Sequence, residues 1–497
     1  MTAQTILPAN SVTGGYEVSN SLRFNSGSSD TLSINMGTSS SRRIWTLSTW
    51  IKLSRDTNAD NMNIVGTGAS DDQNHIGFDG SGSVGNTKIA LRHHNGTSSD
   101  IHIQSNANYN DQSAWYHVVY SVDTTQGTDT NRVKIYVNGT QVTSLATSTY
   151  PSQNYDWDFF QNGSTTYIGR RGHSSAYLLD GYLAETVWID GTQLTPTSFG
   201  EFDEDSGIWK PISVSGLTFG DAGFYLETKQ SGTSQNSSGL GADTSGNDNH
   251  FAVNNLTAVD QSTDTCTNNF ATWNSLVHYS TSATFSEGNL KVAPTENTST
   301  VYTVSTIGMP TVSGSKWYAE FKYLETNDVA IIGILDAAQI SYVFKNNSDL
   351  DNQNGDTSVG RVTYRSGNGL IKFPSGQSVD SSVTLTNNDI VMIALDSGSG
   401  KIWFGVNGTW TNSGDPAADS NGVDFSGQSW WTSGVEDFVF FAGSGNTGGR
   451  DDWEANFGSP SYAISSGNTD GNGYGNFEYA PPSGYFACCT KNLAENG

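Results

Sequence analysis

Hydrophobic and polar residues alternate with a period of two along most of this chain. In segment 116–122 four aromatic or aliphatic residues fall on one face, and segment 133–137 continues the pattern. Because successive side chains of a β-strand point to opposite faces, this period is that of a half-buried strand. Asn138-Gly139 follows directly and is typical of type I′ hairpin turns. The two segments predict an antiparallel pair, joined by the polar loop 123–131.

The second half of the chain repeats this pattern. Alternation over 402–406 is followed by Asn407-Gly408, and the tetrapeptide Val-Asn-Gly-Thr occurs at 137–140 and again at 406–409. Helical periodicity is almost absent. Further strands are predicted at 45–53, 182–189, 317–324, 329–335 and 391–395. The pattern predicts an all-β protein of two antiparallel β-sandwich (jelly-roll) domains joined by a Ser/Gly/Asn-rich connector.

The composition along the chain suggests where these domains begin and end. The connector is rich in Ser, Gly, Asn, Asp and Thr and is expected to hold short strands of its own. The last segment is rich in Gly and Asn and then aromatic, so we expect it to pack back on a domain. The predicted parts are an N-terminal arm (1–20), a first sandwich (21–205), the connector (206–272), a second sandwich (273–466) and a C-terminal tail (467–497).

Charge and cysteine content exclude several classes of protein. The formal net charge is −26, from 49 acidic and 23 basic residues. No basic stripe is visible, so we expect no nucleic-acid partner, and anionic membranes would repel the chain. The three cysteines, Cys266, Cys488 and Cys489, are too few for a disulfide scaffold, and free buried thiols are the favoured state. The first 16 residues lack the pattern of a signal peptide, and no apolar run could span a bilayer.

Paired carboxylates are the sharpest sign of an enzyme in this chain. Glu201, Asp203 and Asp205 alternate, so on a strand they would share a face, as glycoside hydrolysis requires. The glycoside hydrolase motif Glu-x-Asp-x-x-Glu would need a glutamate at position 206, where this chain has Ser206. We therefore favour an exposed acidic turn. Without a Ser/His/Asp triad or a nucleophile elbow, the sequence predicts no catalytic residues and no enzyme.

Metal binding has weak support. The loop Asn468–Gly473 partly mimics a calcium loop, but Tyr479 stands where the last Glu ligand belongs. His93 and His94 are adjacent and point to opposite faces of a strand, and His75 and His102 lack partners at metal spacing. We expect no cofactor and leave calcium and any metal site open.

Two aromatic clusters are the candidates for ligand binding. They comprise Tyr155, Trp157 and Phe159 in one loop-like region and Trp430 with Trp431 in another. Sugars stack on exposed aromatic faces, so either cluster could bind a glycan. The alternative is that these residues anchor long loops or lie at a subunit contact, where Tyr and Trp are enriched.

Several segments also resemble known families. Segments 21–25, 45–53, 115–119, 133–139 and 179–189 resemble a laminin G-like (concanavalin A-like) jelly roll, over about the first 200 residues. Segments 316–320 and 402–408 resemble a SPRY-type sandwich, from about 273 to 457. Relatives of the jelly roll often carry Asp before the Glu of the closing strand, and here Ala184 precedes Glu185. That departure weakens the calcium site that the resemblance implies.

The connecting segments resemble those of bacteriophage virion proteins, including tail-fibre and other structural proteins. They are 243–247, 268–272, 481–485 and 490–493. The resemblance implies a protein on the exterior of the virion, assembled in the host cytoplasm. It implies a tail-fibre or appendage component for host adhesion through a surface glycan. Other virion proteins and copies of this chain, as a threefold homo-oligomer, are the expected partners. A head decoration or assembly protein without a receptor, and a polysaccharide depolymerase, are the alternatives.

Overall fold

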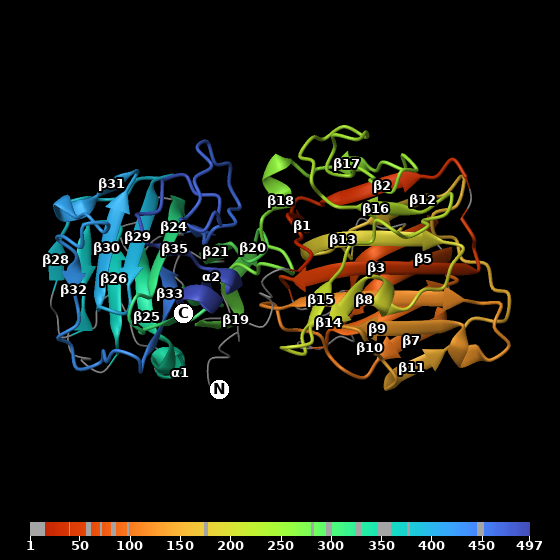
Figure 1. The fold of residues 1–497 in the computed structure, drawn as a ribbon, viewed down its shortest axis with the longest axis horizontal. Coiled ribbons are helices and arrows are strands. Elements are labelled where there is room, and N and C mark those ends of the chain that lie inside the picture. The colour runs from red at the N-terminus through yellow and green to blue at the C-terminus, as the bar shows by residue number, and fades with distance from the viewer. Residues whose placement is uncertain are drawn as a thin grey trace. The chain divides into compact units, whose positions relative to one another are not determined.

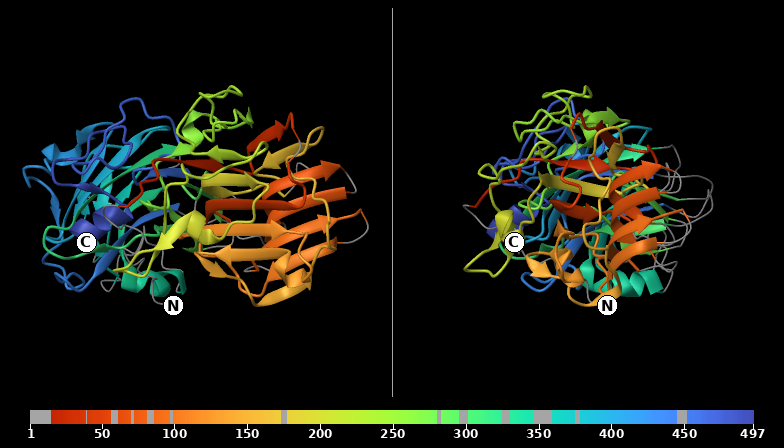
Figure 2. Two further views of the ribbon diagram at one scale, coloured as in Figure 1. Left: turned by 45° about the vertical axis from the view of Figure 1, so that its right-hand side comes forward. Right: turned by 90° about the vertical axis from the view of Figure 1, so that its right-hand side faces the viewer.

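The computed structural model describes residues 15–38, 40–55, 61–69, 72–80, 86–96, 99–172, 177–279, 283–294, 301–324, 330–345, 359–374, 378–444 and 452–497. Figures 1 and 2 show the regular secondary structure of these residues mostly as strands, with helices restricted to short pieces. The predicted all-β, antiparallel class is therefore confirmed. Among the described residues no helix is long and apolar enough to cross a membrane. Contacts divide the chain into an N-terminal unit that ends at Thr267 and a C-terminal unit that begins at Asn268.

Two sheets form the N-terminal unit. The β3 sheet has the order β10 (Thr140–Gln141), β9 (Val133–Val137), β8 (Trp115–Asp123), β3 (Ile44–Leu53), β13 (Gly181–Asp190), β1 (Ser21–Phe24) and β18 (Gln261–Ser262), and β16 (Phe224–Leu226) also pairs with β13. The β5 sheet has the order β11 (Leu145–Thr149), β7 (Ser99–Ser105), β6 (Lys88–His94), β5 (Asp72–Asp79), β4 (Met62–Ala69), β12 (Thr165–Ile168), β2 (Thr31–Asn35) and β17 (Ala252–Asn254). A separate hairpin pairs β14 (Gly200–Phe202) with β15 (Trp209–Pro211).

The predicted hairpin signals are confirmed. β8 and β9 pair in antiparallel register, and Asn138 and Gly139 join β9 to β10. Both turn residues have positive φ angles, 47° and 76°, which the type I′ turn requires. An added Cβ on Gly139 would lie 2.4 Å from the Trp209 ring, so this glycine also lets β15 approach the turn.

The segment expected to be a connector contributes strands to the N-terminal unit. β16 pairs with β13, β17 with β2, and β18 with β1. Phe224, Leu240 and Phe251 from this segment are buried in the same hydrophobic core as both sheets. The division after Thr267 thus differs from the expected domain boundary at 205, because these apolar side chains close the core. Of the expected N-terminal arm, residues 1–14 lie outside the described residues.

The C-terminal unit also has two sheets. The β25 sheet has the order β19 (Trp273–Tyr279), β22 (Val301–Ser305), β33 (Asp437–Ser444), β25 (Ile331–Asp336), β26 (Arg361–Arg365), β27 (Leu370–Lys372) and β28 (Ser378–Asp380), with β23 (Met309–Pro310) on β33. The β24 sheet has the order β20 (Ala283–Ser286), β21 (Lys291–Pro294), β34 (Asp452–Asn456), β24 (Lys316–Leu324), β29 (Ile390–Asp396), β30 (Lys401–Val406) and β31 (Thr409–Trp410), with β32 (Val423–Asp424) on β30 and β35 (Phe486–Ala487) on β24. The two α-helices among the described residues are α1 (Ile340–Lys345) and α2 (Thr490–Asn496).

A buried carboxylate holds the C-terminal segment against β24. Glu320 is fully buried, and its two oxygens accept hydrogen bonds from four donors. The backbone N–H groups of Glu478 (3.0 Å) and Tyr479 (2.7 Å) come from the tail, and the Tyr318 hydroxyl (3.0 Å) and the Asn456 amide (3.1 Å) come from the sheet. Each lone pair is thus used. The pairing of β35 with β24 and the buried rings of Phe477 and Tyr485 also hold the tail.

Replacing this carboxylate should loosen the tail around Glu478. We expect Glu320→Ala to lower the free energy of unfolding of the C-terminal unit by on the order of 3 kcal/mol, because four buried donors lose their acceptor. Limited proteolysis should then cut near Glu478, where the parent chain resists. Glu495→Ala removes an exposed carboxylate from the same tail and should change neither measurement. Equal resistance of the Glu320 and Glu495 variants would contradict this role.

Candidate functional site

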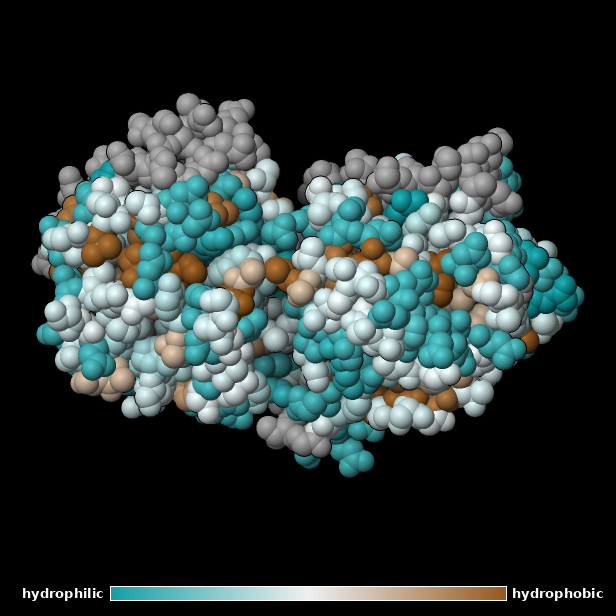
Figure 3. All heavy atoms as spheres, turned by 90° about the horizontal axis from the view of Figure 1, so that it is seen from above, coloured by the Kyte–Doolittle hydropathy of each residue, from teal (hydrophilic) through white to brown (hydrophobic). Residues whose placement is uncertain are grey.

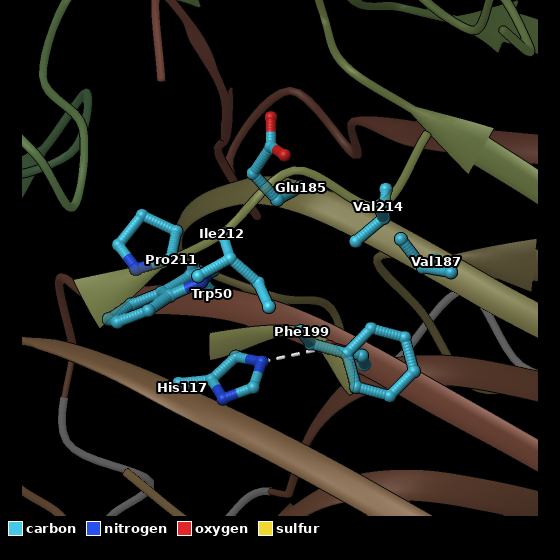
Figure 4. Close-up of a pocket in the computed structure, with 9 residues that line it drawn as sticks. Trp50, His117, Glu185, Val187, Phe199, Pro211, Ile212 and Val214 are labelled. Carbon is cyan, nitrogen blue, oxygen red and sulfur yellow. Dashed lines mark hydrogen bonds between the residues drawn. The ribbon is translucent and has the colours of Figure 1, made fainter. Parts of the chain in front are cut away.

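A small pocket lies on the outer face of the β3 sheet. It is lined by Ser48, Trp50, His117, Glu185, Val187, Phe199, Pro211, Ile212 and Val214 (Figure 4). The pocket has room for about one water molecule. A serine, a histidine and a glutamate thus meet in one pocket, as they do in hydrolases, so their geometry decides whether the pocket can be catalytic.

The histidine of this pocket has its proton on the wrong nitrogen for a general base. The indole N–H of Trp209 donates to His117 Nδ1 at 2.9 Å, and indole can only donate. The proton of the neutral ring therefore sits on Nε2, which lies 2.8 Å from Ser48 Oγ. His117 donates to Ser48 and cannot accept its proton. Burial lowers the pKa of His117 to about 3, so the ring stays neutral.

The glutamate does not orient this histidine either. Glu185 sits at a bulge in β13 with a φ of 51°, and Figure 4 shows its carboxyl group pointing away from His117. Its Oε2 accepts hydrogen bonds from the hydroxyls of Tyr16 (3.1 Å) and Tyr225. Burial raises the pKa of Glu185 to about 7, against the effect of both tyrosines. The pocket is therefore a closed polar cluster without the geometry of a catalytic triad.

Of the alternating acidic residues, Glu201 lies in β14 and Asp205 in the turn that follows, whereas Asp203 between them is buried. Glu201 and Asp205 are exposed, and Lys210 Nζ lies 3.4 Å from Glu201 and 3.0 Å from Asp203. Hydrogen bonds from Ser206 and then Lys210 lower the pKa of Asp203 to about 2. A general acid in a glycosidase needs a raised pKa, so these groups do not form that pair.

The calcium-like loop is occupied by hydrogen-bond donors. The backbone N–H groups of Asn472 and Tyr474 donate to Asp470 Oδ1. The backbone N–H of Ala487 and the side-chain amide of Asn492 donate to Asp470 Oδ2. All lone pairs of this carboxylate accept hydrogen bonds from N–H groups. A calcium ion would need the same lone pairs as ligands. Among the described residues no group of three or more His, Cys, Asp or Glu could hold a metal ion.

The structure places most of the predicted stacking residues inside the cores. Trp157 is 0% exposed and Phe159 is 1% exposed. They pack on Trp45, with ring centroids 6.0 Å and 5.6 Å away. A fully buried ring cannot present its face to a sugar, so these two predictions are corrected. Tyr155 is half-buried and meets Trp157 edge-on at 5.0 Å.

The second aromatic pair has a similar position in the other unit. Trp430 is 8% exposed and stacks on Phe425 at 5.4 Å, so it anchors its loop and does not form a platform. Trp431 is half-buried, and its indole N–H donates to the Ser397 carbonyl at 3.2 Å. The two predicted clusters lie in different units, and each serves mainly the packing of its own.

A row of polar residues crosses the outer face of the β5 sheet. Directly opposite one another are Tyr167 and Gly66, Gly66 and His75, His75 and Arg92, and Arg92 and His102. The neighbouring Ile76 and Leu91 point into the core. Residues opposite each other share a face, so this row comes from strands β12, β4, β5, β6 and β7.

The carboxylate of Asp79 organises this row. His102 Nε2 lies 2.9 Å from Asp79 Oδ2, and the Gln104 amide donates to the same oxygen at 3.0 Å. Arg92 Nη1 lies 3.3 Å from Oδ1. Burial alone would raise the pKa of Asp79, but the His102 hydrogen bond and the Arg92 charge outweigh it and lower this pKa. Asp79 is therefore an anion that fixes three neighbouring side chains, two of which, Arg92 and His102, remain partly exposed.

His75 lies at the centre of the row without hydrogen-bond partners. His75 is only 3% exposed, and neither ring nitrogen has a hydrogen-bond partner within the described part of the chain. Burial lowers the pKa of His75 to about 3, and Arg171 and Arg92 add to this effect. Buried polar atoms normally have partners, so a neutral histidine of this kind marks a place where a ligand or water is expected.

Reasoning from the sequence missed this row. It treated His75 and His102 separately, because neither has a partner at metal spacing along the chain. The signal that was available is the alternation of Gln73, His75 and Asp79 with apolar residues, which places them together on the outer face of one strand. Which residues of β6 and β7 lie opposite depends on the register, and the sequence did not specify it.

Comparisons with known proteins agree with this fold. Residues 26–197 match the family model described as the Concanavalin A-like lectin/glucanases superfamily, so this part of the N-terminal unit has a concanavalin A-like jelly-roll fold. No curated protein matched the chain.

Several solved structures are similar to parts of the chain. The SPRY domain of human HERC1 is 11% identical with a TM-score of 0.27, covering 37% of this chain and 96% of that one. A putative carbohydrate-binding protein from Bacteroides ovatus is 17% identical with a TM-score of 0.30, covering 49% of this chain and 60% of that one. Domains LG4-5 of the mouse laminin α1 chain are 10% identical with a TM-score of 0.26, covering 88% of this chain and 85% of theirs. These likenesses concern the fold alone.

The raised pKa of Glu185 should make the stability of the N-terminal unit depend on pH. Unfolding lowers this pKa from about 7 to its ordinary value of 4.5, so the stabilisation is fully present below pH 4.5 and is lost as the pH rises through 7. We expect Glu185→Gln to abolish a loss of roughly 3 kcal/mol over this range, at about 1.4 kcal/mol per pKa unit. Denaturant unfolding at a series of pH values measures it.

The control for this experiment is Glu201→Gln, which changes an exposed carboxyl group of the same unit. It should leave the pH dependence of the parent chain unchanged. If the Glu185 variant shows the same slope as the parent between pH 4.5 and 7, the buried proton on Glu185 is disproved.

Proposed function

We propose that the chain is a non-catalytic binding protein that recognises a glycan on the outer face of the β5 sheet. The observation that carries this proposal is the fixed set of side chains around Asp79. The concanavalin A-like fold of residues 26–197, a family described by lectins and glucanases, supports it. The pocket that resembles a hydrolase has the wrong histidine tautomer, so a binding role is favoured over a depolymerase.

The polar row suits a sugar because its groups are held in place before binding. Sugar hydroxyls need donors and acceptors in fixed directions, and flexible side chains lose rotamer freedom when they bind. Asp79 fixes Arg92, His102 and Gln104 through hydrogen bonds of 2.9–3.3 Å. Seen from above Figure 1, the surface is mostly hydrophilic, with hydrophobic residues in small separate patches (Figure 3).

The resemblance of the connecting segments to bacteriophage virion proteins supports a finer proposal. On it, the chain is displayed on the exterior of the particle as a tail-fibre or appendage component, beside other virion proteins and as a threefold homo-oligomer, and binds the host surface. Head decoration without a receptor is the alternative. Antibodies against the chain should label the tail of intact particles in electron micrographs. Label confined to the head would favour decoration.

Loss of the organising carboxylate should weaken glycan binding. We expect the purified full chain to bind intact host cells saturably, and Asp79→Ala or His102→Ala to weaken this binding about tenfold, near 1.4 kcal/mol. Fluorescence-detected cell binding measures it, and thermal unfolding checks that each variant is folded.

The matched control for Asp79 is Asp203→Ala, which removes a carboxylate of the same unit that also pairs with a cation. Its binding should equal that of the parent chain. Folded Asp79 and His102 variants that bind as tightly as the parent would move the site away from the β5 sheet.

A further inference from the structure

The cations of the polar row outnumber its anions. Arg92 and Arg171 both act on His75, and Asp79 is the carboxylate that acts on it in turn. Lys88 stands opposite Asp79 in the register and adds a further cation to this face. Asp100 on β7 is engaged with His93 at the edge of the sheet. In a chain with a net charge of −26, a local excess of positive charge is unusual.

The arginines also hold N–H groups without acceptors. Within the described part of the chain, Nε of Arg92 and Nε of Arg171 are buried without a hydrogen-bond partner, as are the nitrogens of His75. Because the His75 ring is neutral, one of its nitrogens is a further N–H donor and the other is an acceptor. The unpaired donors therefore outnumber the unpaired acceptor of this histidine, and unpaired buried donors are costly.

Arg171 reaches this place because of a glycine. A Cβ on Gly66 would lie 2.5 Å from the Arg170 carbonyl oxygen and 2.8 Å from the Arg171 Cα. The backbone of 170–172 therefore lies directly on β4, in the space that a side chain would fill. Gly66 is opposite His75, so this close approach brings Arg171 beside His75. The guanidinium of Arg170 lies 3.8 Å from the centre of the Tyr167 ring, and that of Arg171 lies 5.1 Å from the centre of the Tyr177 ring.

We propose that this face binds an anionic sugar, whose carboxylate or sulfate group is held by Arg92 and Arg171. This inference rests on the proposed glycan-binding function and names its ligand class. A planar guanidinium offers parallel N–H donors that match the oxygens of a carboxylate or sulfate. Asp79 already accepts three hydrogen bonds, so its role is to position Arg92 and His102.

The test compares the affinities of acidic and neutral polysaccharides for the full-length protein. The pairs are polygalacturonate with galactan, alginate with mannan, and dextran sulfate with dextran. The first two acidic members carry carboxylate groups and the third carries sulfate groups, so the pairs distinguish the two anions. We expect at least one acidic member to bind at least about tenfold more tightly than its neutral partner. This binding should weaken between about 50 and about 500 mM NaCl, because salt screens partly exposed charges. Titration calorimetry measures each affinity.

Three variants test whether Arg92 and Arg171 are responsible for the affinity for acidic polysaccharides. Arg92→Ala and Arg171→Ala should each reduce affinity for the acidic member about tenfold. Gly66→Ala should do so too, by displacing Arg171 without removing a charge. Arg43→Ala is the control, since Arg43 is an exposed cation of the same unit that pairs with Asp156, and it should have no effect.

The outcomes separate the two proposals. Equal or tighter binding of the neutral members, lost in Asp79→Ala, would overturn the anionic ligand and leave glycan recognition standing. Acidic binding that Arg43→Ala weakens as much as Arg171→Ala would mean general charge attraction and would overturn the site. Binding of none of the six polysaccharides would overturn both proposals.

Discussion

The central strands of the two large sheets of the N-terminal unit each bury one face against the opposite sheet, and this constraint determines where their polar residues lie. Ile76 on β5 and Leu91 on β6 point into the core, so His75 and Arg92 must point outward. The antiparallel register then sets which outward residues are neighbours. The row from Tyr167 to His102 is a consequence of core packing and register together, and no local motif encodes it.

The same core explains why the exposed face is polar and not aromatic. Trp45 and Trp188 stack at 4.6 Å between the sheets, and Trp157 and Phe159 complete this group from a long loop. A loop of this length needs apolar anchors, because its backbone gains few ladder hydrogen bonds of its own. Its largest rings are therefore used for stability, and the outer face of the sheet carries charged and amide side chains.

The fold class was predictable from the chain, whereas the candidate site was not. Alternation in segments 116–122 and 133–137, followed by Asn138-Gly139, correctly predicted β8, β9 and the turn, because these signals are local. The aromatic cluster misled, because Trp157 gives the same signal in sequence whether it lies in a core or on a surface. The Asp79 row escaped notice because its members come from different strands, and register depends on contacts that a single sequence does not specify.

The two histidine clusters of the N-terminal unit show how hydrogen-bond balance distinguishes structure from function. His117 donates to Ser48 and accepts from Trp209, so both ring nitrogens are satisfied within the protein. That pocket has room for about one water molecule, and neither ring nitrogen of its histidine lacks a hydrogen-bond partner. His75 is equally buried, yet its nitrogens and the Nε atoms of Arg92 and Arg171 have no partners among the described residues. Folding alone would favour satisfying these groups or replacing them by apolar ones, since unpaired buried donors cost stability. Their retention on a partly exposed face is better explained by a partner that brings its own acceptor oxygens.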